Sequence, residues 1–204
     1  QLFPRPGETQ PRLRFPEFRN MIGWKKRKLS DLLSEPKRRN RDLRFGSKDV
    51  LSVSGEFGCV NQIALLGRSY AGASVENYHV VEMGDVVYTK SPLKRNPYGI
   101  IKANRGKAGI VSTLYAVYRP TAKAHAHYLD YYFASDHRLN SYLQPLVKEG
   151  PKNDMKVDNS DVLTGEVWGP DFDEQKRIAE CLNSLDELIR TELQKLDALK
   201  AHKR

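Results

Sequence analysis

Residues 170–176 come closest to a catalytic motif, because they contain the letters of a PD-(D/E)XK nuclease site. A metal site of that kind needs acidic groups that come together from separate strands. Here Asp171 and Glu174 both fall at the start of one expected helix, where acidic residues cap the backbone and interact favourably with the helix dipole. We therefore interpret them as helix-start residues and not as metal ligands.

Other combinations that could support catalysis are incomplete. Residues 96–98 resemble the Asn-Pro-Pro-Tyr motif of adenine methyltransferases, but one proline is missing and no G-x-G loop for a methyl donor occurs in the chain. His125 and His127 are two residues apart, which on a helix directs them to different sides, and no matching Cys/His pair follows. There is no G-x-S-x-G and no Cys/His dyad signature. We predict a non-catalytic chain without a metal or cofactor of its own.

Residues 89–107 point instead to nucleic-acid binding, because six basic side chains alternate there with polar and aromatic ones. Lys and Arg neutralise phosphates, and Arg and Asn can read base edges in the major groove. Residues 148–156 form a second basic loop. The predicted DNA-binding residues are Lys90, Ser91, Lys94, Arg95, Asn96, Tyr98, Lys102, Arg105 and Lys107, with Lys152, Asn153 and Lys156 from the second loop. The alternative is a solvated basic hairpin without a ligand.

Among these residues we expect two roles. The lysines of residues 89–107 are expected to hold phosphates: Lys90, Lys94, Lys102 and Lys107. Base reading is expected from Arg95, Asn96, Arg105 or Asn153.

The distribution of charge supports a polyanion partner. The net charge is +9, yet residues 172–204 hold seven basic and seven acidic side chains, so the whole excess lies in residues 1–171. Within that part, residues 25–44 hold nine basic and three acidic side chains, and residues 84–120 hold seven basic ones with Asp85 as their single acid. Positive charge in two concentrated stretches is typical of a nucleic-acid-binding face.

These residues require a domain to position them, and we expect it over residues 24–171. Strands are predicted at 49–54, 99–102, 110–118 and 162–168, with a strand–turn–strand unit at 77–88, and residues 55–73 read as loop. Helical spacing covers residues 127–147, with a break near Asp136. The predicted class is a mixed α+β fold with mostly antiparallel strands and short helices.

Residues 1–23 contain four prolines, so we expect a linker whose Leu13, Phe15 and Phe18 dock on a surface. Cys59 and Cys181 are far apart and form no disulfide framework, which favours a reducing cytoplasm and buried thiols. The longest apolar run is too short to span a membrane.

Residues 172–204 are predicted to form one long helix, because neither Gly nor Pro interrupts them. Their apolar positions recur at alternating steps of four and three residues, which is typical of a coiled-coil seam. The predicted pairing residues are Ile178, Leu182, Leu185, Ile189, Leu196 and Leu199. The alternative is an ordinary amphipathic helix that packs on its own domain.

Several stretches resemble the specificity (S, HsdS) subunit of type I restriction–modification systems. Residues 24–33 are similar to the start of a target recognition domain, and residues 84–92, 98–120 and 128–135 follow a recurrent pattern of such domains. The end of the chain is the most specific part, with Pro170, Glu174 and the apolar seam resembling the family's conserved helix. Residues 1–18 resemble the segment that often follows the central conserved helix of these subunits, so the chain resembles a second half or a half-subunit.

The resemblance implies a non-catalytic subunit that reads double-stranded DNA. Separate modification subunits would methylate adenine with S-adenosylmethionine, and restriction subunits would use ATP and Mg²⁺ to translocate and cleave DNA. The conserved helix would pair with a copy of itself or with a second specificity half and act as a spacer. An alternative that explains the charge and the seam equally well is a self-contained dimeric nucleic-acid-binding regulator.

Overall fold

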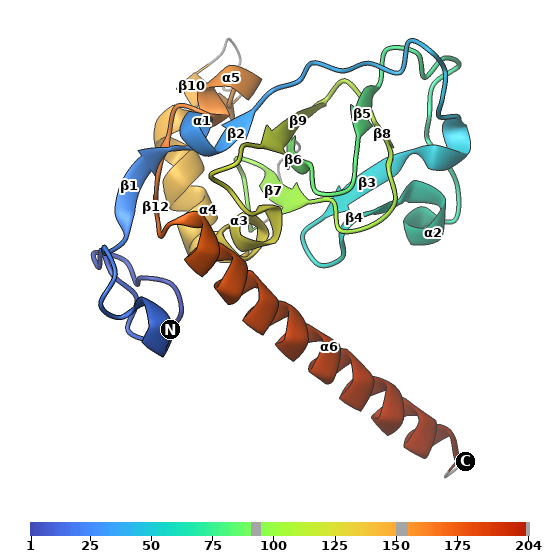
Figure 1. Ribbon diagram of the computed structural model, residues 1–204. Coiled ribbons are helices and arrows are strands. Elements are labelled where there is room, and N and C mark those ends of the chain that lie inside the picture. Colours follow the sequence, from blue (N-terminus) through green and yellow to red (C-terminus); the bar gives the residue numbers. More distant parts are fainter. Residues whose placement is uncertain (91–94, 150–154, 203–204) are drawn as a thin grey trace.

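The computed structural model describes residues 1–90, 95–149 and 155–202. Figure 1 shows an α+β domain from which one long helix extends as a rod. The α-helices are α1 (Leu29–Leu32), α2 (Gln62–Leu66), α3 (Ala126–Tyr132), α4 (Asp136–Leu143), α5 (Asn159–Val162) and α6 (Phe172–His202). Short 3-10 helices are η1 (Pro16–Phe18), η2 (Ser47–Asp49) and η3 (Gln144–Leu146).

The strands pair antiparallel throughout the described residues, apart from one isolated parallel bridge between Val50 and Ile110. The strands are β1 (Lys25–Lys28), β2 (Leu33–Ser34), β3 (Leu51–Ser54), β4 (Gly58–Asn61), β5 (His79–Val81), β6 (Val86–Thr89), β7 (Ile100–Ala103), β8 (Gly109–Val111), β9 (Tyr115–Pro120), β10 (Lys148–Glu149), β11 (Met155–Lys156) and β12 (Glu166–Gly169). The predicted fold class is therefore confirmed, including the long C-terminal helix.

A four-stranded sheet in the order β2-β9-β6-β7 lies at the centre of the domain. All four residues of β6 are buried, as expected for a strand covered on both faces. The other strands form two-stranded pairs, β1-β12, β3-β4, β5-β8 and β10-β11. The predicted DNA-binding residues before and after β7 therefore lie at opposite ends of the β6–β7 strand pair.

Two strands with a turn between them do occur at residues 77–88 as predicted, whereas residues 110–118 are not the single strand that was predicted. The strand–turn–strand unit at residues 77–88 is not a hairpin, because β5 pairs with β8 while β6 pairs with β7 and β9. At the turn between them, the Asp85 carboxylate accepts a hydrogen bond from the Glu82 amide and Gly84 has a φ of 86°, which sends the chain into another sheet. Residues 110–118 are two strands, β8 and β9, separated by a turn in which the Tyr115 amide donates to the Ser112 carbonyl.

The segment at residues 55–73, predicted as loop, contains β4 and α2. The Asn61 side chain accepts hydrogen bonds from the amides of Ile63 and Ala64, and Gly67 ends the helix with a φ of 77°. An asparagine at the start and a glycine after the end are ordinary helix boundaries, so the sequence did contain this signal. The strand predicted at 162–168 is likewise shorter, because α5 ends at Val162.

The largest hydrophobic core joins the sheet, α3, α4 and the first turns of α6. Ile178 and Ala179 of α6 belong to it. The N-terminal segment also docks here, because the Phe3 ring lies 5.6 Å from the Tyr128 ring and 6.0 Å from the Tyr132 ring. Phe15 packs against the same core as expected, whereas Leu13 is exposed. No described helix is both long enough and apolar enough to cross a membrane.

Candidate nucleic-acid interface and pairing helix

The predicted basic stretch at residues 89–107 folds around the antiparallel pair β6–β7. The register pairs Thr89 with Ile100 at one end and Val86 with Ala103 at the other. Gly99 closes the first end, where a Cβ atom would lie 2.0 Å from the Thr89 carbonyl oxygen, so only glycine fits. The described site residues are therefore divided between the two ends of the β6–β7 pair and do not form one loop.

At the Thr89 end, the described residues contact α4. The Arg95 side chain is exposed, and its carbonyl accepts a hydrogen bond from Asn140 at 2.8 Å. Asn96 is buried and donates to the Asp136 carboxylate at 3.1 Å. Tyr98 packs against the main core. Lys90 is half-buried, so Arg95 is the more accessible of these cations.

At the Ala103 end, two of the predicted cations face an acidic group of the protein itself. Arg105 forms an ion pair with Asp130 at 2.7 Å, and the Lys102 ammonium lies 4.0 Å from the same carboxylate. Burial works against the charged form of Arg105, but hydrogen bonding to Tyr131 and the charge of Asp130 raise the pKa of its guanidinium. Lys107 is exposed. Base contacts by Arg105 or Asn96 would require these internal bonds to break.

Four of the predicted DNA-binding residues, Ser91, Lys94, Lys152 and Asn153, lie outside the described residues. Lys156 is placed only as the last residue of β11. Their contribution to DNA binding stays a prediction.

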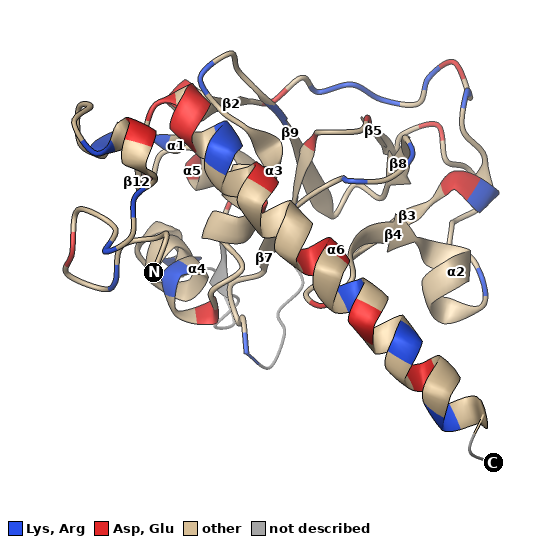
Figure 2. Ribbon diagram, turned by 60° about the horizontal axis from the view of Figure 1, so that its bottom comes forward, with Lys and Arg blue, Asp and Glu red and all other residues tan. Residues whose placement is uncertain are grey.

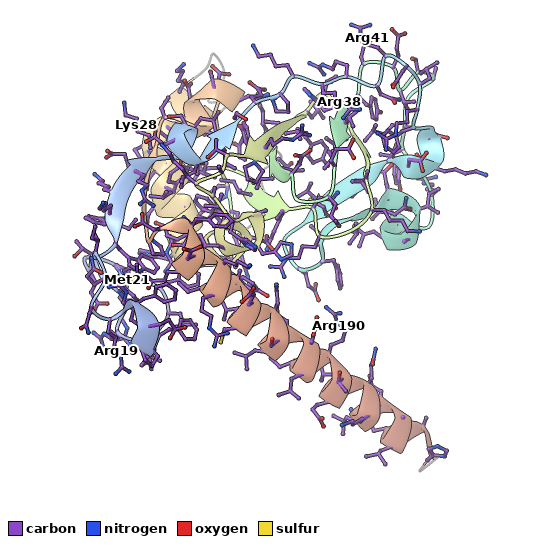
Figure 3. The ribbon with its side chains drawn as sticks, in the orientation of Figure 1. Arg19, Met21, Lys28, Arg38, Arg41 and Arg190 are labelled. Carbon is purple, nitrogen blue, oxygen red and sulfur yellow. The ribbon has the colours of Figure 1, made fainter. Side chains whose placement is uncertain are left out.

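A second basic surface surrounds the turn between β5 and β6. Arg38 and Arg44 both form ion pairs with Glu82, at 3.0 and 3.2 Å, and Arg119 pairs with Asp85 at 3.1 Å. We call this surface the basic rim, and its members are Arg38, Arg41, Arg44, Lys107 and Arg119. Figure 3 shows Arg38 and Arg41 on the same edge of the domain, and Arg41 pairs with Glu76 at 2.8 Å.

The backbone of Lys107 lies close to the backbone of Glu82, the residue that pairs with Arg38 and Arg44. The Asn104 side chain is buried and donates to the carbonyls of both Glu82 and Lys107. The excess charge of residues 25–44 is visible in the sequence, but none of these arginines was predicted as a site residue. The available signal was the count of nine basic side chains in this stretch. The position of the arginines on one surface depends on Glu82, which lies 44 residues after Arg38.

The predicted pairing residues of α6 fall into two groups. Ile178 is buried at 2 % exposure in the main core, and Leu182 packs against that core. These two side chains therefore serve the contact between α6 and its own domain. Gln175 supports this contact, because its side chain is fully buried and bonds to Lys123, His125 and Pro170.

The remaining pairing residues lie on the part of α6 that stands away from the domain (Figure 1). Leu185, Ile189, Leu196 and Leu199 are between 46 % and 63 % exposed, and Leu188 and Leu193 beside them are exposed as well. We call these six residues the distal stripe. Figure 2 shows that basic and acidic residues are mixed along the helix, in agreement with its neutral charge.

The side chains that resembled catalytic motifs make structural contacts. Asp171 pairs with Arg27, and Glu174 is buried against Arg14 and Trp24. His127 bonds to Asn183, and burial lowers the pKa values of His125 and His127. No group of three or more His, Cys, Asp or Glu side chains that could hold a metal ion occurs among the described residues.

The Cys59 thiol is expected to be unreactive. Burial and the nearby Asp130 carboxylate raise its pKa to about 12, so the nucleophilic thiolate is scarce at pH 8. Mass spectrometry after iodoacetamide treatment should find Cys59 unmodified in the native protein at pH 8 and modified after unfolding in urea. Rapid alkylation of the native thiol would contradict this environment.

No family model matches the chain, and no curated protein sequence matches it. Solved structures do. The HsdS subunit from Thermoanaerobacter tengcongensis superposes with a TM-score of 0.50 over 89 % of this chain and 41 % of its own, at 19 % identity. The S subunit of a type I restriction–modification system from M. genitalium gives 0.52 over 89 % of this chain and 43 % of its own, at 13 % identity.

A third match comes from a structure that describes complex assembly and conformational transition of the type I R-M system. It gives a TM-score of 0.57 over 92 % of this chain and 46 % of its own, at 20 % identity. The chain has the fold of a type I S subunit. It spans less than half of the length of each of these proteins. The S-subunit fold accounts for the domain and for the helix that leaves it.

Proposed function

We propose that this chain recognises a DNA sequence as a specificity subunit, or as half of one, in a type I restriction–modification complex. The observation that carries this proposal is the S-subunit fold over about nine-tenths of the chain. Two further features support it: the net positive charge lies wholly in residues 1–171, and the distal stripe leaves an apolar surface for a second helix. In this role the chain catalyses no reaction and directs adenine methylation and DNA cleavage by partner subunits.

The cofactors belong to those partners in this proposal. S-adenosylmethionine would be bound by the modification subunit, and ATP and Mg²⁺ would be used by the restriction subunits. The chain would act in the cytoplasm, where it meets double-stranded DNA. Through the distal stripe it would pair with a copy of itself or with a second specificity half.

The basic rim and the exposed Arg95 are the surfaces that fit DNA best. Arg38, Arg41, Arg44 and Arg119 keep between 43 % and 65 % of their side chains exposed, so a phosphate can approach them from the solvent. Ion pairs between exposed side chains contribute little stability, so exchanging Glu82 for a phosphate costs little. We propose that the rim, including Lys107, holds the DNA backbone through phosphate contacts while Arg95 reads bases.

Removing two arginines of the basic rim should weaken binding to all DNA sequences. For Arg38→Ala/Arg44→Ala we expect the slope of log K against log salt to fall by about 2, because each phosphate contact contributes roughly 0.9. Fluorescence anisotropy over a salt series measures this. The control Lys176→Ala/Lys195→Ala removes two charges from exposed positions of α6 and should leave the slope unchanged. Equal slopes for both double variants would remove the rim from the interface.

The variant Glu82→Gln should change DNA affinity in the opposite direction at the same surface. It keeps the side-chain size but no longer neutralises Arg38 and Arg44, so binding should become tighter at low salt.

The proposed role itself is tested with the modification subunit. The chain should co-purify with it, and adenine methylation mapped by single-molecule sequencing should show a motif that disappears when the chain is omitted. The dimeric regulator is the outcome if the chain binds DNA as a pair and forms no complex with a methyltransferase subunit.

A further inference from the structure

The root of α6, which we define as residues 172–186, is held by the domain on opposite sides. Glu174 and Asn183 are nine residues apart. At about 100° per residue, this separation places them on opposite faces of the helix. Glu174 contacts the N-terminal segment, whereas Asn183 contacts α3 and the turn after β7. Between these two sides, Ile178 and Ala179 enter the core.

On the Asn183 side, three polar side chains form what we call the joint: Arg105, Tyr131 and Asn183. The Tyr131 hydroxyl lies 2.9 Å from Asn183 Oδ1 and donates to the Asp186 carboxylate at 2.5 Å. Arg105 also donates to Asn183 at 2.9 Å, and its guanidinium lies 4.4 Å from the centre of the Tyr131 ring. Asp130 holds Arg105 in place from the other direction.

The joint borders an unfilled part of the contact between α6 and the domain. A cavity of about 250 Å³ separates the β3–β4 hairpin from α6 here, and its lining includes Phe57, Arg105, Tyr131, Asp186 and Arg190. Figure 3 shows Arg190 on the face of α6 that is turned toward this hairpin. Farther along the helix, the ion pairs Lys195–Glu192 and Lys200–Asp197 join residues of α6 to each other. The direction of the free half is therefore set at the root.

We propose that Arg105, Tyr131 and Asn183 are positioning residues that fix the direction of α6, and with it the distal stripe, relative to the DNA-binding domain. The consequence for DNA is a fixed distance between two half-sites, and this part of the inference rests on the proposed function. The bases read by the domain would be independent of the joint. Arg105 would then act between domain and helix, although its residue type also suits base reading.

Two measurements test this, and the first needs no DNA. Spin labels at positions 113 and 198, with both native cysteines replaced and labelled protein diluted in unlabelled protein, report the distance between domain and distal α6. Both positions are exposed. Tyr131→Phe keeps the ring beside Arg105 but removes the hydrogen bond donated to Asp186 and the one accepted from Arg105. Asn183→Ala removes the side-chain oxygen that accepts from Arg105. We expect both variants to raise the population away from the native distance by roughly 5- to 25-fold, because the loss of one or two hydrogen bonds at about a factor of five each gives this range.

The matched control is Tyr70→Phe. Tyr70 is an exposed tyrosine whose ring lies 4.6 Å from the Arg68 guanidinium, so the substitution removes the same hydroxyl from a similar pair outside the joint. It should leave the distance distribution as in the unmodified protein. A distribution that is equally narrow in Tyr131→Phe, Asn183→Ala and the control would overturn the proposal.

The second measurement uses the assembled complex and DNA duplexes that differ in the number of base pairs between the half-sites. In complexes that contain a joint variant, the preference for one spacing should fall roughly 10-fold, while the modification subunit methylates the same bases. A merely destabilised domain would instead lose base recognition and spacing together. If the spin-label distances broaden while the preferred spacing is unchanged, the joint holds α6 but the helix does not set the spacing, which contradicts the functional part of the inference alone.

Discussion

Replacing Glu174 by alanine should lower the free energy of unfolding by about 3–5 kcal/mol, because it leaves a buried guanidinium without its carboxylate. Arg14 donates two hydrogen bonds to Glu174, at 2.8 and 2.7 Å, and the Trp24 indole donates a third at 3.3 Å. The side chains of Arg14 and Glu174 are only 13 % and 4 % exposed. Hydrogen bonding to this carboxylate raises the pKa of Arg14. A guanidinium is also charged without such a partner, so removing Glu174 leaves the charge of Arg14 in place.

Urea denaturation followed by fluorescence measures this effect, and Trp24 lies directly at the altered site. The control is Asp173→Ala, which removes an exposed acidic residue from the same first turn of α6. It tests the helix dipole alone and should cost about 0.3–1 kcal/mol. If the two alanine variants unfold at the same urea concentration, the buried pair does not hold the N-terminal segment to α6.

The second large effect is expected on the distal stripe. Ile189→Lys/Leu196→Lys should weaken pairing of α6 with a second helix by at least about 3 kcal/mol, a factor of more than roughly 100 in Kd, because each apolar side chain gains about 1.5–3 kcal/mol on full burial. The two side chains are 58 % and 46 % exposed, so the thermal stability of the domain should be unchanged. Sedimentation equilibrium over a concentration series measures the association.

The matched control for this pair is Leu114→Lys, which changes an exposed leucine at the turn between β8 and β9. It should associate like the unmodified protein. Equal association of all three proteins would mean that the distal stripe does not form the pairing surface.

The local features of this chain were predictable because they depend on neighbours in the sequence. The helix of residues 172–204 follows from its spacing and the lack of Gly and Pro, and α6 begins at Phe172. The break between α3 and α4 was visible at Asp136, where Ser135 caps the second helix. The antiparallel α+β class was also predicted, but the pairing of β5 with β8 was not, because pairing is a long-range choice that alternating residues do not specify.

The candidate site was predicted less well for the same reason. Asn96 and Arg105 have residue types that suit base reading, but their polar groups bond to Asp136 and Asp130, which the chain brings to them only on folding. Conversely, residues 25–44 were noted only for their excess of basic side chains, and it is Glu82 that brings Arg38 and Arg44 near Lys107 in the folded chain.

The sequence by itself therefore determined that a basic region precedes a neutral helix with an apolar stripe, since charge and periodicity are sums over adjacent residues. The tertiary structure alone decided how that stripe is divided. Ile178 and Leu182 are covered because the core of the domain reaches them, and the stripe from Leu185 onward stays exposed because α6 outruns the domain. The apolar spacing is the same along both parts of the helix. Only the position of the domain surface therefore decides which apolar residues of α6 are buried in the core and which remain exposed.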